Sequence, residues 1–380
     1  MTASIGKSSY TETVLLACGS FESEQNKSDL SSKTSSWILS PGLDLFFACG
    51  GLVWLLFLVH YFLLGAGRSG EFAIALLGLS SLGAVFLAEV HSAATIIHTY
   101  RKPELLNAFP LQSKILPALL LPVAVLGSFY APITPVLVKI YLLLVPHHFM
   151  AQSYGIARVY CLKNNYELNS EERFSMLMLT CSTTFYAVSK QLAANQTGTA
   201  TFLGQSVPPW GILPQGFVDA SLLFLIASAI NFVTHLSIRF FKSGDLFPFS
   251  AFLTMLTGIA AFTLNPTASG IYWLYVSAFF HATQYLLIVL SVDWKEQNKR
   301  SGTERLKSLL SNSSSSRLLG CFLLLSLGIY FGLPGILVNL GANYTLCSAA
   351  IFVCVNIHHI VLDGEIWKLR SEKIRQSVSA

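Results

Sequence analysis

Charged side chains are scarce in this chain. Lys, Arg, Asp and Glu make up 11% of its 380 residues, against about 25% in soluble domains. A soluble domain of this length needs a charged shell around its core, so the composition excludes a soluble globular protein and a disordered chain. The net charge of +5 is also too small for the basic surface that a nucleic-acid-binding protein needs.

Motifs for the common cofactors are lacking too. The seven cysteines form no C-x-x-C pair, so neither a disulfide framework nor a cysteine metal site is predicted. The sequence has no flavin, nicotinamide or iron–sulfur motif, and no Asp-rich box of the kind that lipid-biosynthetic transferases carry. If the chain performs redox chemistry, its electrons are expected to come from a separate partner.

Apolar residues are abundant and come in long blocks. They make up 53% of the chain, and the mean hydropathy is +0.58. A bilayer core of about 30 Å takes about 20 residues of helix, and the alternation of a membrane β-barrel is lacking. We therefore predict an all-α fold, a polytopic integral membrane helical bundle of about ten transmembrane helices. The ten predicted blocks are 44–64, 71–100, 112–130, 133–158, 173–191, 217–240, 249–266, 268–291, 318–336 and 343–363.

Lys and Arg predict the orientation of the bundle. Nearly all of them fall before the first block, after the second, fourth, sixth and eighth blocks, and in the tail. Because basic residues mark cytoplasmic loops, both termini are predicted to be cytoplasmic. Residues 1–36 read as a disordered cytoplasmic tail and 37–367 as the transmembrane domain. That domain carries a basic, Ser-rich cytoplasmic loop at 293–317, and 368–380 form a short basic cytoplasmic tail.

Histidine carries the functional signal. All of the nine histidines except His60 lie in the second, fourth, sixth, eighth and tenth blocks, which run from outside to inside. Each lies in the cytoplasmic half of its block, and scattered core histidines would not sort in this way. Ionisable side chains at membrane depth are costly, so they are functional candidates by default. The set is His91, His98, His147, His148, His235, His281, His358 and His359.

The spacing of these histidines predicts a metal site. His91 and His98 are seven residues apart and share a helix face. The segments 147–152 (HHFMAQ) and 358–363 (HHIVLD) both read His-His-x-x-x-Gln/Asp. Imidazole and carboxylate together are the ligands of non-haem iron, and imidazole also suits copper and zinc. The predicted metal ligands are His91, His98, His147, His148, His281, His358, His359 and Asp363.

Other polar residues near these ligands are predicted to support them. A ligating imidazole usually donates its second N–H to a carboxylate or an amide. Glu89, Gln152, Gln284 and Asn356 are spaced to accept such bonds. For His235, which lies near the cytoplasmic edge without a paired partner, a structural role is the equal alternative.

The pattern resembles, in kind, the integral-membrane non-haem iron oxygenases and desaturases. Those families carry HxxxH and HxxHH boxes, where this chain has His-x6-His, two HHxxx[QD] boxes and HxxQ at 281–284. A looser likeness is to the bacterial membrane dioxygenases that cleave carotene. The resemblance implies one or two iron ions, and oxidation of a lipid-like or other apolar substrate in the membrane by an oxygenase, hydroxylase or desaturase.

Two other functions stay open at this stage. A haem-binding electron carrier needs one histidine on each of two helices at matched depth, which His147 or His148 with His281 would provide. A transporter of protons, metal or a small solute would use intramembrane His and Asp as a relay. The histidines outnumber the needs of one haem, and their one-sided placement differs from the midplane sites of transporters.

Overall fold

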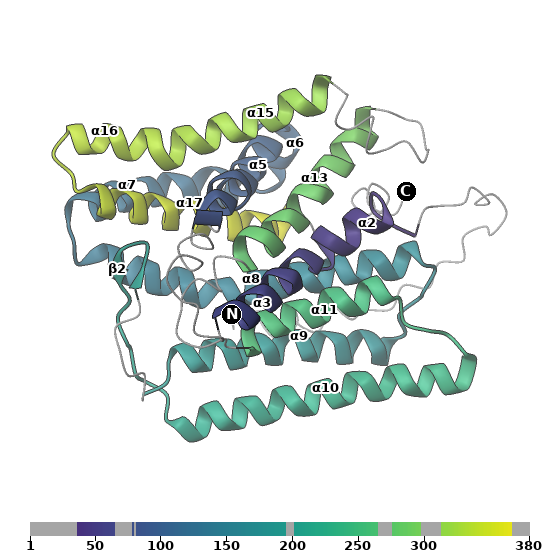
Figure 1. Ribbon diagram of the computed structural model, residues 1–380. Helices are drawn as coiled ribbons and strands as arrows, with labels where there is room; N and C mark the ends of the chain where they lie inside the picture. Colours follow the sequence, from purple (N-terminus) through teal and green to yellow (C-terminus); the bar gives the residue numbers. More distant parts are fainter. Residues whose placement is uncertain are drawn as a thin grey trace, which may run out of the picture. The chain divides into compact units, whose positions relative to one another are not determined.

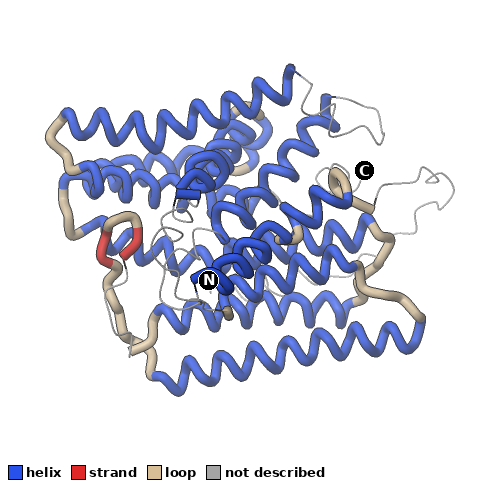
Figure 2. The backbone as a smooth tube through the Cα atoms, viewed as in Figure 1, coloured by secondary structure: helices blue, strands red, loops and turns tan. Residues whose placement is uncertain are grey.

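The computed structural model describes residues 36–64, 78–79, 81–194, 201–264, 276–297 and 313–366. The predicted tails 1–36 and 368–380, apart from residue 36, lie outside the described residues, as does most of the predicted loop 293–317. The all-α prediction is confirmed. Within the described residues the only strands are the two of a short hairpin, β1 (Thr201–Phe202) and β2 (Gln205–Ser206), drawn in red in Figure 2.

Helices fill the rest of the fold, and several begin or end in a π-helical turn, labelled η. In chain order they are α2 (Pro41–Leu43), η2 (Asp44–Ala48), α3 (Gly51–Leu64), η3 (Ala84–Ala88), α5 (Glu89–Tyr100), α6 (Pro103–Ala108), η4 (Leu111–Ile115), α7 (Leu116–Phe129), α8 (Ile133–Lys163), α9 (Ser170–Gln191), α10 (Gln215–Ser243), α11 (Phe249–Thr263), η5 (Val276–His281), α13 (Ala282–Gln297), α15 (Ser313–Leu327), η6 (Gly328–Gly332), α16 (Leu333–Asn339) and α17 (Tyr344–Ile366).

Six of these helical segments are long and apolar enough to cross a membrane. They are Ser81–Tyr100, Leu111–Phe129, Ile133–Lys163, Gln215–Ser243, Ser316–Asn339 and Tyr344–Ile366. A seventh span is formed if Pro41–Ala48 and Gly51–Val59, bent by 55°, count as one. The bend lies at Gly50, whose φ of +90° favours glycine. The structure is thus consistent with a membrane protein.

The predicted number of ten spans is not confirmed. Every predicted block contains helix, but three of the helices fall short of a span. α11 and the apolar segment Phe279–Val292, which joins the end of η5 to α13, are shorter than the others. α9 is long enough, but it carries Glu171, Glu172, Arg173 and Lys190 and many Ser and Thr residues. Ten spans and cytoplasmic termini therefore stay predictions.

The helices pack around α8 and α17. α17 lies against α5, α7 and α8, while α8 also packs against α9 and α11. α7 and α17 approach closely at Gly127, where an added Cβ would lie 3.2 Å from Cβ of Ala350. α10 packs against α9 and lies at the lower edge of the bundle in Figure 1.

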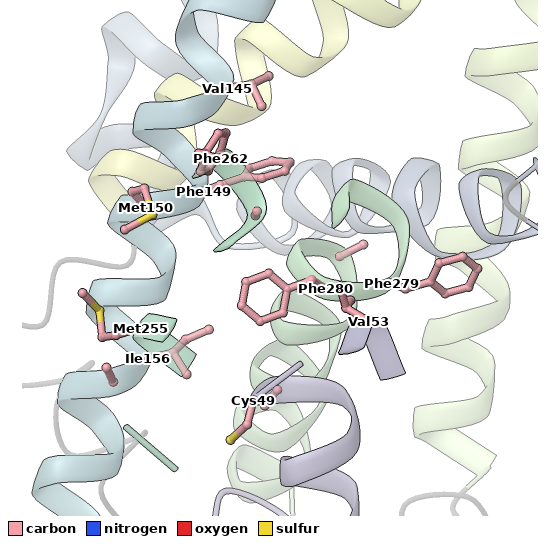
Figure 3. Close-up of a cluster of buried hydrophobic side chains, with 14 of the residues drawn as sticks. Cys49, Val53, Val145, Phe149, Met150, Ile156, Met255, Phe262, Phe279 and Phe280 are labelled. Carbon is pink, nitrogen blue, oxygen red and sulfur yellow. The ribbon is translucent and has the colours of Figure 1, made fainter. Parts of the chain in front are cut away.

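An apolar core joins α8, α11, η5 and α3. The ring centroids of Phe149 of α8 and Phe262 of α11 are 6.2 Å apart, and Phe280 and Val53 belong to the same apolar core (Figure 3). The ring of Phe149 also stacks on His281, with centroids 4.1 Å apart. The apolar core therefore borders directly on the histidines described below.

One buried carboxylate anchors the start of the bundle. Asp44, which is 0% exposed, accepts hydrogen bonds from the backbone N–H groups of Ile38 (2.6 Å), Leu39 (3.1 Å) and Ser40 (3.3 Å). The hydroxyl of Tyr160, near the end of α8, donates a fourth bond at 3.0 Å. This carboxylate ties the segment before α2 to α8.

Replacing Asp44 by Asn should destabilise the fold. The two carboxylate oxygens accept four hydrogen bonds, whereas an amide has a single accepting oxygen. We expect a loss of about 1–3 kcal/mol in the free energy of unfolding. Tyr160→Phe removes one donor and should cost less, about 1 kcal/mol. Denaturant unfolding in detergent measures both. Tyr130→Phe, which removes an exposed hydroxyl, is the control, and an Asp44→Asn loss no larger than this control would contradict the role of the carboxylate.

Candidate metal centre

Four histidines from four parts of the chain form a compact cluster. His91 comes from α5, His148 from α8, His281 from the end of η5, and His359 from α17. The ring centroids are 4.6 Å apart for His91–His359 and for His148–His281, 4.9 Å for His148–His359, and 5.0 Å for His91–His281. All four side chains are buried, with 1% to 7% exposure. We call this group, with Asp363, the histidine cluster.

Irregular helix geometry surrounds the cluster. The π turn η3 ends three residues before His91, and the π turn η5 ends on His281 itself. A π turn adds a residue to the helix and so changes which side chains share a face, and such turns are frequent at functional sites. In α8, Pro146 lies two residues before His148. These features help to set where the imidazoles point.

Two imidazole nitrogens face each other at a short distance. Nε2 of His148 lies 3.1 Å from Nε2 of His359. Two nitrogens bound to one ion at about 2.0–2.1 Å are roughly 2.9 Å apart at a right angle and roughly 3.4 Å apart at the tetrahedral angle. The observed distance lies between these values. The spacing is therefore compatible with a single bound ion, and it is also that of a hydrogen bond between the two imidazoles.

The remaining ligand atoms lie within reach of the same place. One nitrogen from each of His91, His281 and His359 lies within 4.8 Å of the other two, and the same holds for His148, His359 and Asp363. Oδ2 of Asp363 is 3.6 Å from Nε2 of His359. Both groups include His359, so they adjoin each other.

Several buried imidazole nitrogens of the histidine cluster have no hydrogen-bond partner among the described residues. The Nδ1 of His91 is hydrogen-bonded to the backbone oxygen of Ala88, which leaves its Nε2 as a lone-pair nitrogen. That Nε2 is buried without a hydrogen-bond partner in the part of the chain that the structure describes. Both ring nitrogens of His281 are in the same situation. Unpaired buried polar atoms are rare in folded proteins, and a bound metal ion would satisfy Nε2 of His91 and one of the two ring nitrogens of His281.

Hydrogen bonding to Thr95 determines which ring nitrogen of His359 carries the proton. Its Oγ1 lies 2.7 Å from the Tyr285 hydroxyl, 2.8 Å from Nδ1 of His359 and 3.0 Å from Oδ1 of Asp363. A carboxylate only accepts, and a hydroxyl has one proton to donate. Thr95 therefore donates to Asp363 and accepts from the Nδ1–H of His359. This arrangement leaves the lone pair of His359 on Nε2, which faces His148.

The predicted glutamines support the backbone of the centre instead of its imidazoles. Nε2 of Gln152 donates to the backbone oxygen of His281 at 2.9 Å and to Oε1 of Gln284 at 3.0 Å. Nε2 of Gln284 in turn donates to the backbone oxygen of Ala48, the last residue of η2, at 2.7 Å. The pair links α8, η5 and η2 and so holds the π turn that presents His281.

The other two predicted supporting residues lie to one side. Asn356 lines the cavity described below, accepts from Ser92 Oγ at 3.0 Å and donates to the Tyr330 hydroxyl at 3.3 Å. Glu89 precedes His91 by two residues and lies on another face of α5. Its Oε2 is buried without a hydrogen-bond partner within the described residues.

The structure leaves the other predicted histidines outside the cluster. His147 is exposed, because it points about 100° around α8 from His148. His98 is buried two helical turns beyond His91, and His358 is buried 6.2 Å from the ring of Tyr100. His235 lies 3.5 Å from the carboxylate of Glu171 on α9. None of the four belongs to a metal-ligand group among the described residues.

Thr95 is the residue that sequence reasoning missed. It lies four residues after His91, so the two share a face of α5, and this spacing is the signal that would have found it. Threonine is common inside membrane helices, where its hydroxyl bonds the preceding turn of backbone, and so it carried no weight in the sequence. Tyr285, which lies near the cluster in the chain, proves to be the partner of Thr95.

A small cavity opens beside the four imidazoles. Its volume is about 20 Å³, which suffices for one water-sized molecule. Its lining combines the four histidines and Asn356 with apolar side chains, namely Ala88, Tyr141, Val145, Phe149, Phe352 and Ile360. The cavity therefore has room for one water-sized species, such as an ion or a small ligand, beside the imidazoles. The donor set of neutral nitrogens and a carboxylate suits iron, zinc or copper.

No family model, no curated protein and no solved structure matches this chain. Its function must therefore be argued from the histidine cluster itself.

Thr95→Val should weaken metal binding without removing any ligand. Valine has the shape of threonine but cannot accept the Nδ1–H of His359, so the tautomer and the ring orientation are no longer held. We expect a 10- to 100-fold loss of cobalt(II) affinity, measured by optical titration of the detergent-purified protein. Thr99→Val is the matched control, because the Thr99 hydroxyl bonds the backbone oxygen of Thr95 and, within the described residues, no side chain of the cluster. Equal affinities in the two variants would contradict the role of Thr95.

Proposed function

We propose that this chain is a membrane-bound, metal-dependent oxidoreductase that acts on a lipid-like or other apolar substrate. The observation that carries the proposal is the convergence of four buried imidazoles, with unpaired nitrogens, on one small cavity. The metal proposed is iron. When bound, it would supply one-electron chemistry with dioxygen.

The geometry favours one ion over two. Nδ1 of His359 carries the proton that it donates to Thr95, so His359 has only Nε2 to offer a metal. Since both candidate ligand groups include His359, they describe alternative parts of one coordination shell. His91, His148, His281 and His359 would hold the ion, and Asp363 would either ligate it or stay hydrogen-bonded to Thr95.

The protein's own side chains would orient the site and keep it dry. Phe149 stacks on His281 and lines the cavity beside Val145 and Phe352. These side chains exclude bulk water from the reacting position, which strengthens electrostatic interactions there. The chain formed by Tyr285, Thr95 and Asp363 would hold a proton next to His359.

The size of the cavity restricts how substrate reaches the centre. A volume of about 20 Å³ admits a small molecule such as dioxygen or water and excludes a lipid chain. The apolar wall of Phe149, Phe352 and Ile360 is the part that would have to open to an apolar substrate. Because the chain lacks flavin, nicotinamide and iron–sulfur motifs, the electrons would come from a separate protein partner.

The alternative functions receive less support from the geometry. A bis-histidine haem would need a porphyrin between two imidazoles, whereas the rings of His148 and His281 have centroids 4.6 Å apart and His147 is exposed outside the cluster. A transporter would need a path through the bundle, and the cavity is small. An optical spectrum tests the haem alternative, which a Soret band would support. Metal flux in vesicles would support the transporter.

Metal content tests the proposal. Protein purified without oxygen from iron-supplemented cells should contain about one iron per chain, measured by elemental analysis. His148→Ala or His359→Ala should reduce this content at least tenfold, because each removes an imidazole whose nitrogen lies at the centre. His147→Ala should leave it unchanged, since His147 is the exposed neighbour on the same helix. No transition metal in the unsubstituted protein, or equal loss in all three variants, would overturn the proposal.

A further inference from the structure

An amide side chain is exposed in the middle of α10, which packs against α9 at the edge of the bundle. Asn231 lies near the centre of the candidate span Gln215–Ser243, and its side chain is exposed. Within the described part of the chain it has no hydrogen-bond partner. Lipid offers an amide no hydrogen bond, so an unpaired amide at this depth is unfavourable. A partner from outside the chain would relieve this cost.

The residues around Asn231 form a regular stripe. Exposed side chains recur along one face of α10 at alternating intervals of four and three residues, as in the seam of a coiled coil. They are Ala220, Phe224, Ala227, Asn231, Thr234 and Ile238. We call this stripe the Asn231 face. Ala220, Ala227 and Thr234, each seven residues after the last, are small, and small residues let two membrane helices approach closely.

The Asn231 face is separate from the face that α10 already uses. A second stripe with the same spacing, containing Ser221, Leu225, Ser228 and Phe232, is buried and turned toward α9. The Asn231 face lies about 100° around the helix from it. α10 therefore has two stripes suited to helix packing, and α9 covers one of them (Figure 1).

We propose that the Asn231 face binds the same face of a second copy of the chain. Two copies inserted in one membrane have the same orientation, so their α10 helices run parallel and equivalent residues meet at the twofold axis. Asparagine has both a donor and an acceptor, so two Asn231 amides satisfy each other reciprocally. A single asparagine in such a seam also sets the register of the two helices.

Self-association of the full chain in mild detergent tests this inference. Light scattering should give a dimer for the unsubstituted protein, and Asn231→Leu should weaken dimerisation at least tenfold. Asn231→Gln, which keeps an amide, should retain more of the dimer than Asn231→Leu. Ile230→Leu is the control, because Ile230 is exposed next to the Asn231 face but not part of it. Monomers for the unsubstituted protein in detergent and in membranes would overturn the proposal.

Disulfide cross-linking in native membranes provides a test that does not depend on detergent. Ala227→Cys and Thr234→Cys lie on the Asn231 face and should give a cross-linked product of twice the chain mass. Leu222→Cys and Val233→Cys, exposed on the opposite side of α10, should give only the background that the native cysteines produce in the unsubstituted chain. Cross-linking through Leu222→Cys and Val233→Cys, or to a different protein, would overturn the assignment of this face to a second copy. Neither test uses the metal, so its outcome is distinguishable from that of the proposed function.

Discussion

The packing of four buried imidazoles against one another is the constraint on which the rest of this structure depends. Without a cation, the unpaired nitrogens of His91 and His281 are a cost to the fold, because buried polar atoms need partners. The facing Nε2 atoms of His148 and His359 lie within hydrogen-bond distance of each other. A bound ion would turn this cost into binding energy. The surroundings are arranged accordingly, since Ala88 and Thr95 fix protons on the nitrogens that face away from the centre.

The helices around the cluster hold it from several directions. α5, α8, η5 and α17 each supply one imidazole, so no single helix defines the site. The Gln152–Gln284 pair fastens the π turn before α13 to α8 and η2, and Phe149 covers the ring of His281. A site built on helices and supported in this way keeps its ligands in place. The small mixed cavity then defines which molecules can reach it.

Much of the fold and part of the site could be predicted from the sequence. Hydropathy located the helices, since every apolar block contains helix. It did not establish their number as spans, because α9 combines helical length with charged ends and α11 is short. The histidine pattern included all four clustered imidazoles and Asp363, but it also included His98, His147 and His358. Helix periodicity says which residues share a face of one helix. It does not say which helices are neighbours.

Local packing and irregular helix turns explain why the predicted ligands and the clustered residues differ. His147 and His148 are adjacent in the chain, and only the packing of α8 against α17 decides which of them points inward. The π turns η3 and η5 lie next to His91 and His281 and change the facing of residues in a way that a regular helical period does not describe. Thr95 was missed because one hydroxyl among many carries no pattern, although it contacts His359, Asp363 and Tyr285 at once.

X-ray absorption spectroscopy of the iron-loaded protein tests the central claim most directly, because it reports the ligands of the metal itself. The account predicts a first shell of nitrogen and oxygen atoms at about 2.0–2.2 Å, with the outer-shell scattering of at least three imidazole rings and no sulfur. A first shell containing sulfur, or fewer than three imidazoles, would contradict the assignment of the histidine cluster as a metal centre.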